Sequence, residues 1–394
     1  MNSRSALPYY ETCEFATTLR GQAVRFISKP GMPHWDHISP ATRLLAEAIQ
    51  VPAGSRVLVL GCGPGALGIA LGGTIPGGDI RLADTNFVAL NMAERTIRAN
   101  NLPNVSVDRD AAVLPNRAQS FDAVAVELPS GRKLARRWLL AAHEFLRPGG
   151  DLYLAGPNNE GIQSVVDDAR DLFGNVVVLG YKERNRVARA RKGSSDAAPP
   201  AWTEEPGIAP GTWYELDVHV RNLSFHLRSL PGVFAFDKLD DGTSLLLSAL
   251  DVPQGSRVLD IGCGYGIIGL VAARLGAAHV DMVDVNLLAI AAVHENITRN
   301  AIDNAFAFPS DVAGAVTGQR YDLIVSNPPF HAGKAVDYDV AATIIEDARR
   351  LLSPGGRLVL VANRFIRYDR LMAKLFKRVH VLAENRRFHV LAAM

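Results

Sequence analysis

Short runs of apolar, often β-branched residues alternate along the chain with longer stretches in which apolar positions recur at helical spacing. In the second half, apolar runs at residues 257–261 and 279–283 are each followed by such a stretch. This alternation predicts βαβ units, and so an α/β fold built on a doubly wound, mostly parallel sheet. Four later runs continue the pattern, and the last two predict an antiparallel edge of the sheet: 322–326, 357–361, 379–383 and 387–391.

Several landmarks of the first half return about 200 residues later in the second half. The stretch Val-Pro-Xaa-Gly-Ser-Arg-Val-Leu spans residues 51–58 and again residues 252–259. Asp84 is matched by Asp284, and a Pro-Gly-Gly turn follows later in both halves. Because landmarks in one order at nearly one spacing rarely arise by chance, the chain is predicted to be a tandem duplication of one Rossmann-like domain.

A segment rich in Ser, Ala, Pro and Gly separates the two halves. Residues 193–212 lack periodicity, which predicts a linker or surface loop between domains at 1–192 and 213–394. Just after it, residues 214–220 and 223–227 alternate apolar and polar side chains. This alternation predicts a β-hairpin at the start of the second domain.

The composition fits two globular domains, because 48% of the 394 residues are apolar and 21% are charged. Residues 1–15 lack a signal-peptide pattern, and no apolar run approaches the roughly 20 residues that cross a bilayer. Three scattered cysteines favour neither a disulfide framework nor a zinc site. We therefore expect a cytoplasmic monomer without a metal. Its net charge of +2 leaves any nucleic-acid affinity to local basic patches.

Three glycines follow the apolar run at residues 257–261 and open the next helical stretch. Gly262, Gly264 and Gly266 lack a Cβ, so the backbone there can come close to a ligand. Asp284 ends the next strand about 20 residues later, where its carboxylate can accept hydrogen bonds from both hydroxyls of a ribose. The longer glycine pattern that seats a pyrophosphate is absent, so a nucleoside without phosphates fits better than NAD.

The motif Asn-Pro-Pro-Phe at residues 327–330 directly follows the apolar run at 322–326. It should lie at the carboxyl edge of the sheet, where open α/β sheets bind ligands. Two consecutive prolines fix the backbone, so the Asn327 side chain and the Pro328 carbonyl form a rigid pair of acceptors. Such a pair suits a planar amine whose ring stacks on Phe330, with its lone pair turned toward an electrophile. No strong base is needed, because the nitrogen becomes acidic as its new bond forms.

Residues 260–266 resemble the first motif of class I methyltransferases, which bind S-adenosylmethionine. The resemblance implies that Gly262 and Gly264 lie against this cofactor and that Asp284 binds its ribose. Asp311, after the following strand, matches the polar residue beside the adenine. The Asn-Pro-Pro-Phe motif is shared by members that methylate amino groups of adenine, guanine or glutamine.

Four stretches resemble the RsmC-type ribosomal RNA guanine-N2 methyltransferases: 230–234, 239–247, 327–331 and 361–365. That family also has tandem domains with catalysis in the second. The resemblance implies methylation of a guanine N2 in small-subunit ribosomal RNA, as RNA or as a subunit assembly intermediate. The cofactor residues would be Asp260, Gly262, Gly264, Gly266, Asp284, Asp311, Thr243 and Asn327. The catalytic residues would be Asn327, Pro328 and Phe330, and the substrate would contact Asp240, Phe330, His331 and Arg364.

Three other functions stay open on the sequence alone. The RlmG-type enzymes, which methylate large-subunit RNA, share most of these motifs. Adenine N6 or a protein glutamine also fits the motif, although the tandem architecture favours ribosomal RNA. An RNA-binding ribosome assembly factor could keep the cofactor only for stability, but the intact Asn-Pro-Pro-Phe argues against it.

In the first half, Glu127 occupies the position of Asn327 and Ser130 that of Phe330. Amino-methyl transfer is therefore not expected there. The glycine turn and Asp84 persist, which is consistent with either a second cofactor site or an inherited turn. Basic residues gather at 182–192 and at 364–387, where they could contact RNA or form solvated surfaces.

Overall fold

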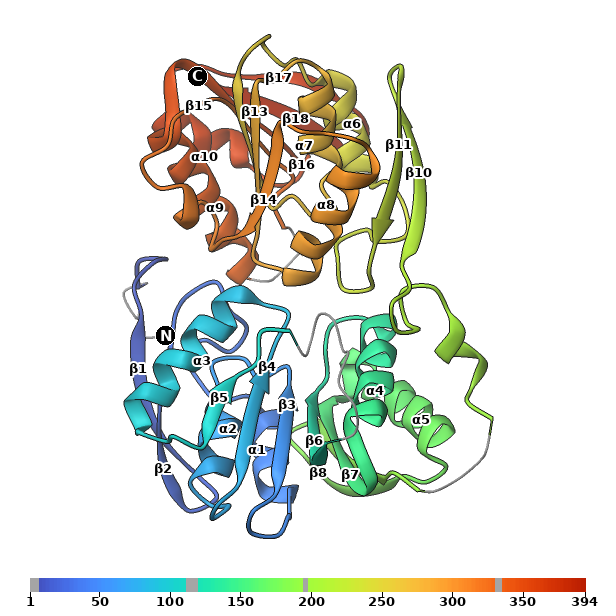
Figure 1. The fold of residues 1–394 in the computed structure, drawn as a ribbon. Helices are drawn as coiled ribbons and strands as arrows, with labels where there is room; N and C mark the ends of the chain where they lie inside the picture. The colour runs from blue at the N-terminus through green and yellow to red at the C-terminus, as the bar shows by residue number, and fades with distance from the viewer. Residues whose placement is uncertain (1–6, 111–119, 194–197, 330–334) are drawn as a thin grey trace. The chain divides into compact units, whose positions relative to one another are not determined.

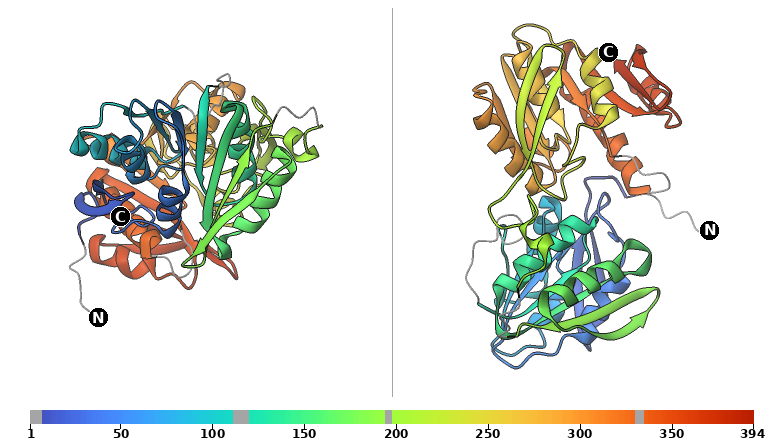
Figure 2. Two further views of the ribbon diagram at one scale, coloured as in Figure 1. Left: turned by 90° about the horizontal axis from the view of Figure 1, so that it is seen from below. Right: turned by 90° about the vertical axis from the view of Figure 1, so that its right-hand side faces the viewer.

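The computed structural model describes residues 7–110, 120–193, 198–329 and 335–394 (Figure 1). The chain folds into two compact units, Met1–Trp213 and Tyr214–Met394. Each unit begins with a two-stranded hairpin and continues into a seven-stranded sheet with helices packed on its two faces (Figures 1 and 2). The predicted pair of Rossmann-like domains is thus confirmed.

The sheet of the first unit has the strand order β5-β4-β3-β6-β7-β9-β8. Strands β5 to β7 run parallel, and β9 and β8 form an antiparallel edge. The strands of this unit are β1 (Cys13–Leu19), β2 (Gln22–Ser28), β3 (Arg56–Leu60), β4 (Asp79–Ala83), β5 (Val105–Val107), β6 (Phe121–Glu127), β7 (Leu146–Pro157), β8 (Val177–Lys182) and β9 (Asn185–Arg191). Its helices are α1 (Pro40–Ala48), α2 (Ala66–Gly72), α3 (Phe87–Asn100), α4 (Arg132–Phe145) and α5 (Ile162–Phe173), with short 3-10 turns at Asn158–Glu160 and Ala201–Glu204.

The second unit repeats this order as β14-β13-β12-β15-β16-β18-β17. Its strands are β10 (Tyr214–Val220), β11 (Leu223–Ser229), β12 (Arg257–Ile261), β13 (His279–Asp284), β14 (Ala305–Pro309), β15 (Tyr321–Ser326), β16 (Leu352–Asn363), β17 (Val379–Glu384) and β18 (Phe388–Ala393). Its helices are α6 (Asp241–Ala249), α7 (Ile267–Arg274), α8 (Leu287–Arg299), α9 (Ala335–Leu351) and α10 (Tyr368–Leu375), with a 3-10 turn at Gly314–Val316. The expected opening hairpin and the antiparallel edge are both present.

Both sheets are fixed in the same way where their central strands begin. The backbone N–H of Arg56 donates to the Asp122 carboxylate at 2.7 Å, and that of Arg257 donates to Asp322 at 2.9 Å. Central residues such as Val258 and Leu259 are fully buried, which contributes roughly 2 kcal/mol each. Strands β14, β13, β12, β15 and β16 pair in parallel, so their carboxyl ends lie at one edge of the sheet, where the candidate site is found.

The segment predicted as a linker differs from the expectation. Its described part, residues 198–212, packs on the first unit, with Trp202 and Ile208 buried. Arg137 of α4 donates to the carbonyl oxygen of Gly207 at 2.7 Å, and the Arg136 guanidinium lies 5.2 Å from the Trp202 ring. A few apolar residues inside a polar segment were enough to anchor it, so the first unit extends to Trp213.

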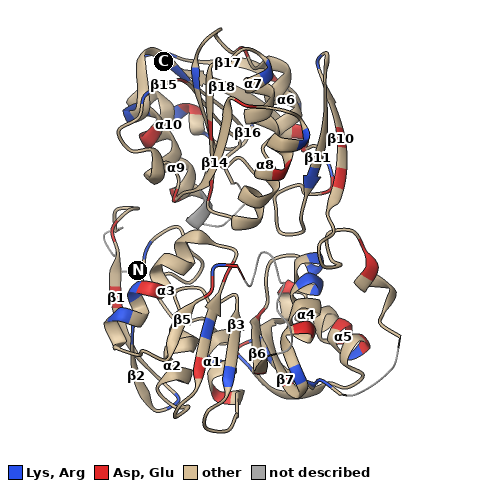
Figure 3. Cartoon of the chain, in the orientation of Figure 1, with Lys and Arg blue, Asp and Glu red and all other residues tan. Residues whose placement is uncertain are grey.

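The basic segment at 182–192 holds the last residue of β8, the turn after it and β9. Lys192 is buried, and its ammonium donates to the carbonyl oxygens of His143 and Leu146 at 2.6 and 2.9 Å. Arg191 pairs with Asp151 through two hydrogen bonds of 2.9 Å. Lys182 and Arg184 stay exposed. Because Lys192 is buried and Arg191 is paired, only part of this segment is available to a phosphate backbone. Figure 3 shows that Lys and Arg are also spread over the rest of both units.

Candidate active site

The glycine turn after β12 leaves open space above its backbone. Gly262 and Gly264 have φ of +74° and +55°, and no atom lies within 4 Å of the place where a Cβ would stand. The N–H groups of Gly262 and Cys263 donate to the Val283 carbonyl oxygen at 2.8 and 3.1 Å, which fixes the turn to the end of β13. Gly266 differs, because a Cβ there would lie 3.0 Å from Val293 of α8. Its expected contact with the cofactor is therefore accompanied by a packing role between α7 and α8.

Asp284 lies directly beside this turn. Its carboxylate accepts hydrogen bonds from the backbone N–H groups of Gly264 and Asn286, both at 2.9 Å. Burial raises the pKa of the Asp284 carboxyl, while these two backbone donors favour its ionised form. Asp311 follows β14, and the adjoining Ser310 N–H donates to the Asp284 carbonyl oxygen at 2.9 Å. The two acids expected to contact ribose and adenine therefore follow neighbouring strands at one edge.

Asp260 is the penultimate residue of β12, and its side chain is fully buried. Its Oδ2 accepts from the Gly269 N–H of α7 at 2.9 Å, whereas its Oδ1 has no partner among the described residues. Burial, together with the nearby negative charge of Asp284, raises the pKa of Asp260 to about 7. This carboxyl thus ties the glycine turn to α7 and keeps one oxygen free for a donor.

Asn327 follows β15 and is oriented by α6. Its Nδ2 donates to the Thr243 hydroxyl at 2.8 Å and to the Asp240 carboxylate at 3.3 Å. Asp240 also caps α6 by accepting from the Thr243 N–H at 2.9 Å. A carboxylate can only accept, so the amide nitrogen must face it, and Asn327 Oδ1 is left buried without a partner. Asp240 and Thr243 therefore hold the acceptor in place.

The remaining predicted residues have different outcomes. Pro328 is buried directly after Asn327. Phe330 and His331 lie outside the described residues. Arg364 follows β16, but its guanidinium contacts the β17–β18 turn, donating to the Asn385 carbonyl oxygen at 3.3 Å and pairing with Glu384 at 3.6 Å. The guanidinium of Arg364 therefore already contacts Glu384 and Asn385, and the predicted contact with substrate would be made in addition to these.

We call the glycine turn with the aspartate beside it the cradle. The first unit repeats the cradle, but at the position of Asn327 it has a residue whose hydrogen bonds run in the opposite direction. The Asp84 carboxylate accepts from the N–H groups of Gly63 and Asn86 at 3.0 and 2.9 Å, as Asp284 does. At the end of β6, however, Glu127 accepts from the hydroxyls of Ser39 and Thr42, both at 2.6 Å. Two donors now face a carboxylate, where the second unit has an amide between two acceptors.

The space above the first glycine also differs between the units. A Cβ on Gly61 would lie 3.0 Å from the Trp138 ring and 3.1 Å from the Glu127 carbonyl oxygen, whereas the corresponding space at Gly262 is open. The sequence analysis missed Ser39, Thr42 and Trp138. Extending the repeat upstream would have aligned Ser39 with Asp240 and Thr42 with Thr243, but no repeat pattern shows which side chain covers a glycine.

Two other searches bear on the chemistry. In the described part of the chain, no group of three or more His, Cys, Asp or Glu side chains is arranged to hold a metal ion. None of the helices within the described ranges combines the length and apolarity that a bilayer crossing requires.

Comparisons with known proteins agree with this geometry. The family model of the methyltransferase small domain matches residues 23–189 and 224–392. The ribosomal RNA small subunit methyltransferase C of Chromohalobacter salexigens is 38% identical over 270 residues, 68% of this chain and 76% of that protein. Its counterpart in Pseudoalteromonas atlantica is 35% identical over 275 residues, covering 69% and 76%. The solved structure of the T. thermophilus 16S rRNA N2 G1207 methyltransferase, in complex with AdoMet and guanosine, matches with a TM-score of 0.81 and 31% identity over 97% of both chains.

Proposed function

Because the chain belongs to the methyltransferase small domain family, and within it to the ribosomal RNA small subunit methyltransferase C family, we propose that it methylates the N2 amine of a guanine in small-subunit ribosomal RNA. The methyl donor is S-adenosylmethionine. The observation that carries this proposal is the buried, unpartnered Oδ1 of Asn327 at the same sheet edge as the Asp284 cradle. An oxygen without a donor in a rigid site is suited to receive an amine hydrogen.

The residues around the glycine turn fit the cofactor. Asp284 can accept from the ribose hydroxyls, and the open space above Gly262 and Gly264 admits a ligand against the backbone. The free Oδ1 of Asp260 suits a cationic amino group, such as S-adenosylmethionine carries. When bound, this cofactor supplies an electrophilic methyl group on a sulfonium. Asp311 and Thr243 complete the expected cofactor contacts.

The protein contributes position rather than acid–base chemistry. The target amine donates one hydrogen to Asn327 Oδ1 and the other to the Pro328 carbonyl, which turns the nitrogen lone pair toward the methyl donor. The C–N bond forms as the S–CH₃ bond breaks, and the nitrogen then releases a proton to solvent. Asp240 and Thr243 act through Asn327, because they keep its amide from rotating. Phe330 stacks on the base, and His331 and Arg364 contact the RNA.

The form of the substrate follows from the acceptor pair. In a G·C pair one hydrogen of the N2 amine is bonded to cytosine and the base is held in the stack, so the guanine must leave its helix or be single-stranded to give both hydrogens to this site. A ribosomal subunit assembly intermediate offers such a guanine before the RNA is locked in place. All residues named for catalysis belong to one unit of one chain, which supports action as a monomer. A ribosomal RNA substrate places the reaction in the cytoplasm.

The test is methyl transfer to RNA from a strain that lacks this gene. Purified protein, labelled S-adenosylmethionine and ribosomal RNA should yield N2-methylguanosine in the small-subunit RNA, identified after nuclease digestion. Label in the large-subunit RNA, in N6-methyladenosine or in a release-factor glutamine would assign one of the alternative substrates. Binding of RNA and cofactor without any transfer would indicate an assembly factor.

A further inference from the structure

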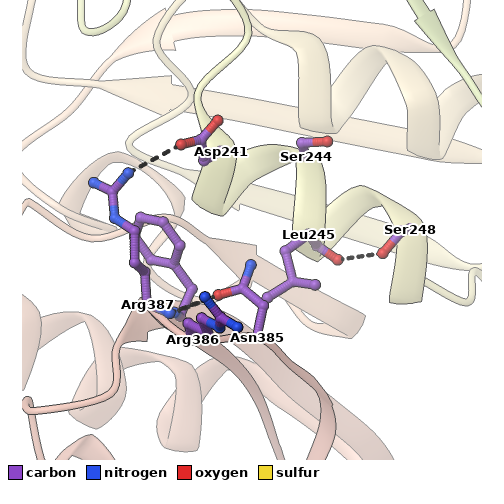
Figure 4. Close-up of a pocket in the computed structure, with 8 residues that line it drawn as sticks. Asp241, Ser244, Leu245, Ser248, Asn385, Arg386 and Arg387 are labelled. Carbon is purple, nitrogen blue, oxygen red and sulfur yellow. Dashed lines mark hydrogen bonds and ion pairs between the residues drawn. The ribbon is translucent and has the colours of Figure 1, made fainter.

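A pocket of about 500 Å³ lies between α6 and the β17–β18 turn, outside the residues assigned above to chemistry. Figure 4 shows the two walls facing each other. One wall is the outer face of α6, with Asp241, Ser244, Leu245 and Ser248 at the one-turn spacing that places side chains on a common stripe. Its volume is in the range of roughly 300–1,000 Å³ that small-ligand sites occupy. We call it the α6 pocket.

The opposite wall carries the positive charge. Asn385 shapes the turn, because its side-chain oxygen accepts from the N–H groups of Arg387 and Phe388, both at 2.8 Å. Arg386 and Arg387 project from this turn and are exposed. Arg386 has no carboxylate partner among the described residues. Arg387 pairs with Asp241 at 3.1 Å, but both side chains are at least 70% exposed, so the pair is weak and a phosphate can replace it.

The α6 pocket adjoins the acceptor site through one layer of residues. Phe388 lines the pocket, and its ring would lie 3.3 Å from a Cβ on Gly242. Gly242 in turn lies against the Asp240 carboxylate, which holds Asn327. The α6 pocket therefore lies one layer of residues from the carboxylate that holds Asn327.

The lining combines the groups that recognise a nucleotide. Leu245 offers apolar contact, the hydroxyls of Ser244 and Ser248 can hydrogen-bond, and the two arginines suit phosphate oxygens. Phe365 is 67% exposed, and the adjoining Arg364 N–H donates to the Arg387 carbonyl oxygen at 2.9 Å. An aromatic ring on this side provides a stacking surface for a further base.

We propose that the α6 pocket binds the nucleotide adjoining the target guanine in single-stranded RNA, with Arg386 and Arg387 on its phosphate. This inference rests on the proposed function for the identity of the strand. A general attraction between RNA and basic residues would depend on charge alone. The proposed site also needs empty space, so filling the pocket should weaken RNA binding even when the charge is unchanged.

The experiment compares three variants of the full-length protein in the presence of S-adenosylhomocysteine. The probe is a fluorescent single-stranded RNA of about ten nucleotides with one central guanine, a length within the range that one site covers. The double variant Arg386→Gln, Arg387→Gln should weaken binding about tenfold and lower the salt slope by about 0.7, because both arginines contact one phosphate and each phosphate contact on a single strand contributes about 0.7. Ser244→Trp fills the pocket without changing charge, so it should weaken binding at an unchanged slope.

The matched control is Arg320→Gln, Arg349→Gln, which removes two exposed charges near the start of β15 and the end of α9. It should change affinity by less than about twofold. Equal losses in the control and the Arg386/Arg387 variant, or full affinity in Ser244→Trp, would overturn the proposal. The proposed function is judged separately by N2-methylguanosine formation in the wild-type protein, so either can fail while the other stands.

Discussion

The two units share the contacts that shape a nucleoside cradle and differ in the side chains that would use it. Asp84 and Asp284 each accept from a glycine N–H and from the N–H of the asparagine that caps the next helix, at nearly equal distances. At the end of the fourth parallel strand, by contrast, Glu127 accepts from two hydroxyls and Asn327 donates to two acceptors. The backbone contacts around the two aspartates are thus the same in both units. The hydrogen bonds of the strand-end residue run in opposite directions, because Glu127 accepts where Asn327 donates.

That reversal leaves an unpartnered amide oxygen at the end of β15, whereas both carboxylate oxygens at the end of β6 accept hydrogen bonds. The amide in the second unit uses its nitrogen for support and presents a free oxygen. The carboxylate in the first unit is saturated by hydroxyls on both oxygens, and burial raises its pKa. The Trp138 ring also covers the glycine whose counterpart is open in the second unit. The first unit therefore has less space above its first glycine, whereas Gly63, like Gly264, has open space above it.

The largest expected difference concerns the two strand-end residues. Asn327→Ala should lower kcat a hundredfold or more, since removing a preorganised contact to the reacting centre costs about 3 kcal/mol of activation free energy. Glu127→Ala should leave kcat within about twofold. Single-turnover methylation of ribosomal RNA measures both, with calorimetry of cofactor binding as the control. Comparable losses in the two variants would erase the distinction between the units.

A second test uses Asp260, whose counterpart in the first unit is Val59. Burial raises the pKa of Asp260 to about 7, from an unfolded value of about 3.9. The folded state therefore holds the proton more tightly, so this group favours folding at low pH and loses that contribution as pH rises from 4 to 7. Asp260→Asn keeps an acceptor for the Gly269 N–H but does not titrate.

The stability of Asp260→Asn relative to the wild type should thus improve by about 2 kcal/mol between pH 5 and pH 7. Denaturant unfolding of the full chain at several pH values measures this difference. Val59→Ile, in the first unit, serves as a control that should show no such pH dependence. A constant offset between the Asp260 variant and the wild type would mean that the carboxyl is not protonated on folding.

The cradle acids provide the third test. Asp284→Ala should weaken S-adenosylmethionine binding by about 2 kcal/mol, because charge-assisted hydrogen bonds to the ribose are lost. Asp84→Ala should leave cofactor affinity unchanged, and the full chain should bind one cofactor, since Trp138 covers Gly61. Isothermal titration gives both the affinity and the stoichiometry. Two equivalents of bound cofactor would show that the first unit is still open.

The smallest effect is expected from the exposed end of the β8–β9 hairpin. Lys182→Gln, Arg184→Gln should weaken RNA binding a few-fold and reduce its salt slope by between one and two. Free cofactor binding should not change. Filter binding of ribosomal RNA at several salt concentrations measures the slope. If affinity and slope both stay at wild-type values, the RNA path runs over the second unit alone.

The sequence predicted the parts of the molecule that depend on local pattern. The duplication, the alternation of strands and helices, the β10–β11 hairpin and the antiparallel β17–β18 edge follow from periodicity and motifs. The roles expected of Asp284 and Asn327 rest on the same motifs and stay predictions. The contacts of Ser39 with Glu127 join residues 88 positions apart, so no local signal reveals them. Burial of Lys192 and packing of Trp202 likewise depend on neighbours in space, and a basic or polar run looks the same whether or not it finds them.

The strand order at the antiparallel edge has a consequence for local unfolding of the second unit. Strand β18 follows β17 in the chain but pairs between β16 and β17, and all six of its residues are buried. The edge strand β17 thus joins the sheet only through β18, and the two strands form one antiparallel hairpin. Such a hairpin can open as a cooperative unit of its own. Phe388 of this hairpin packs against Gly242, next to the Asp240 carboxylate that holds Asn327. Opening would therefore remove the arginine wall of the α6 pocket and disturb the support of Asn327 at the same time.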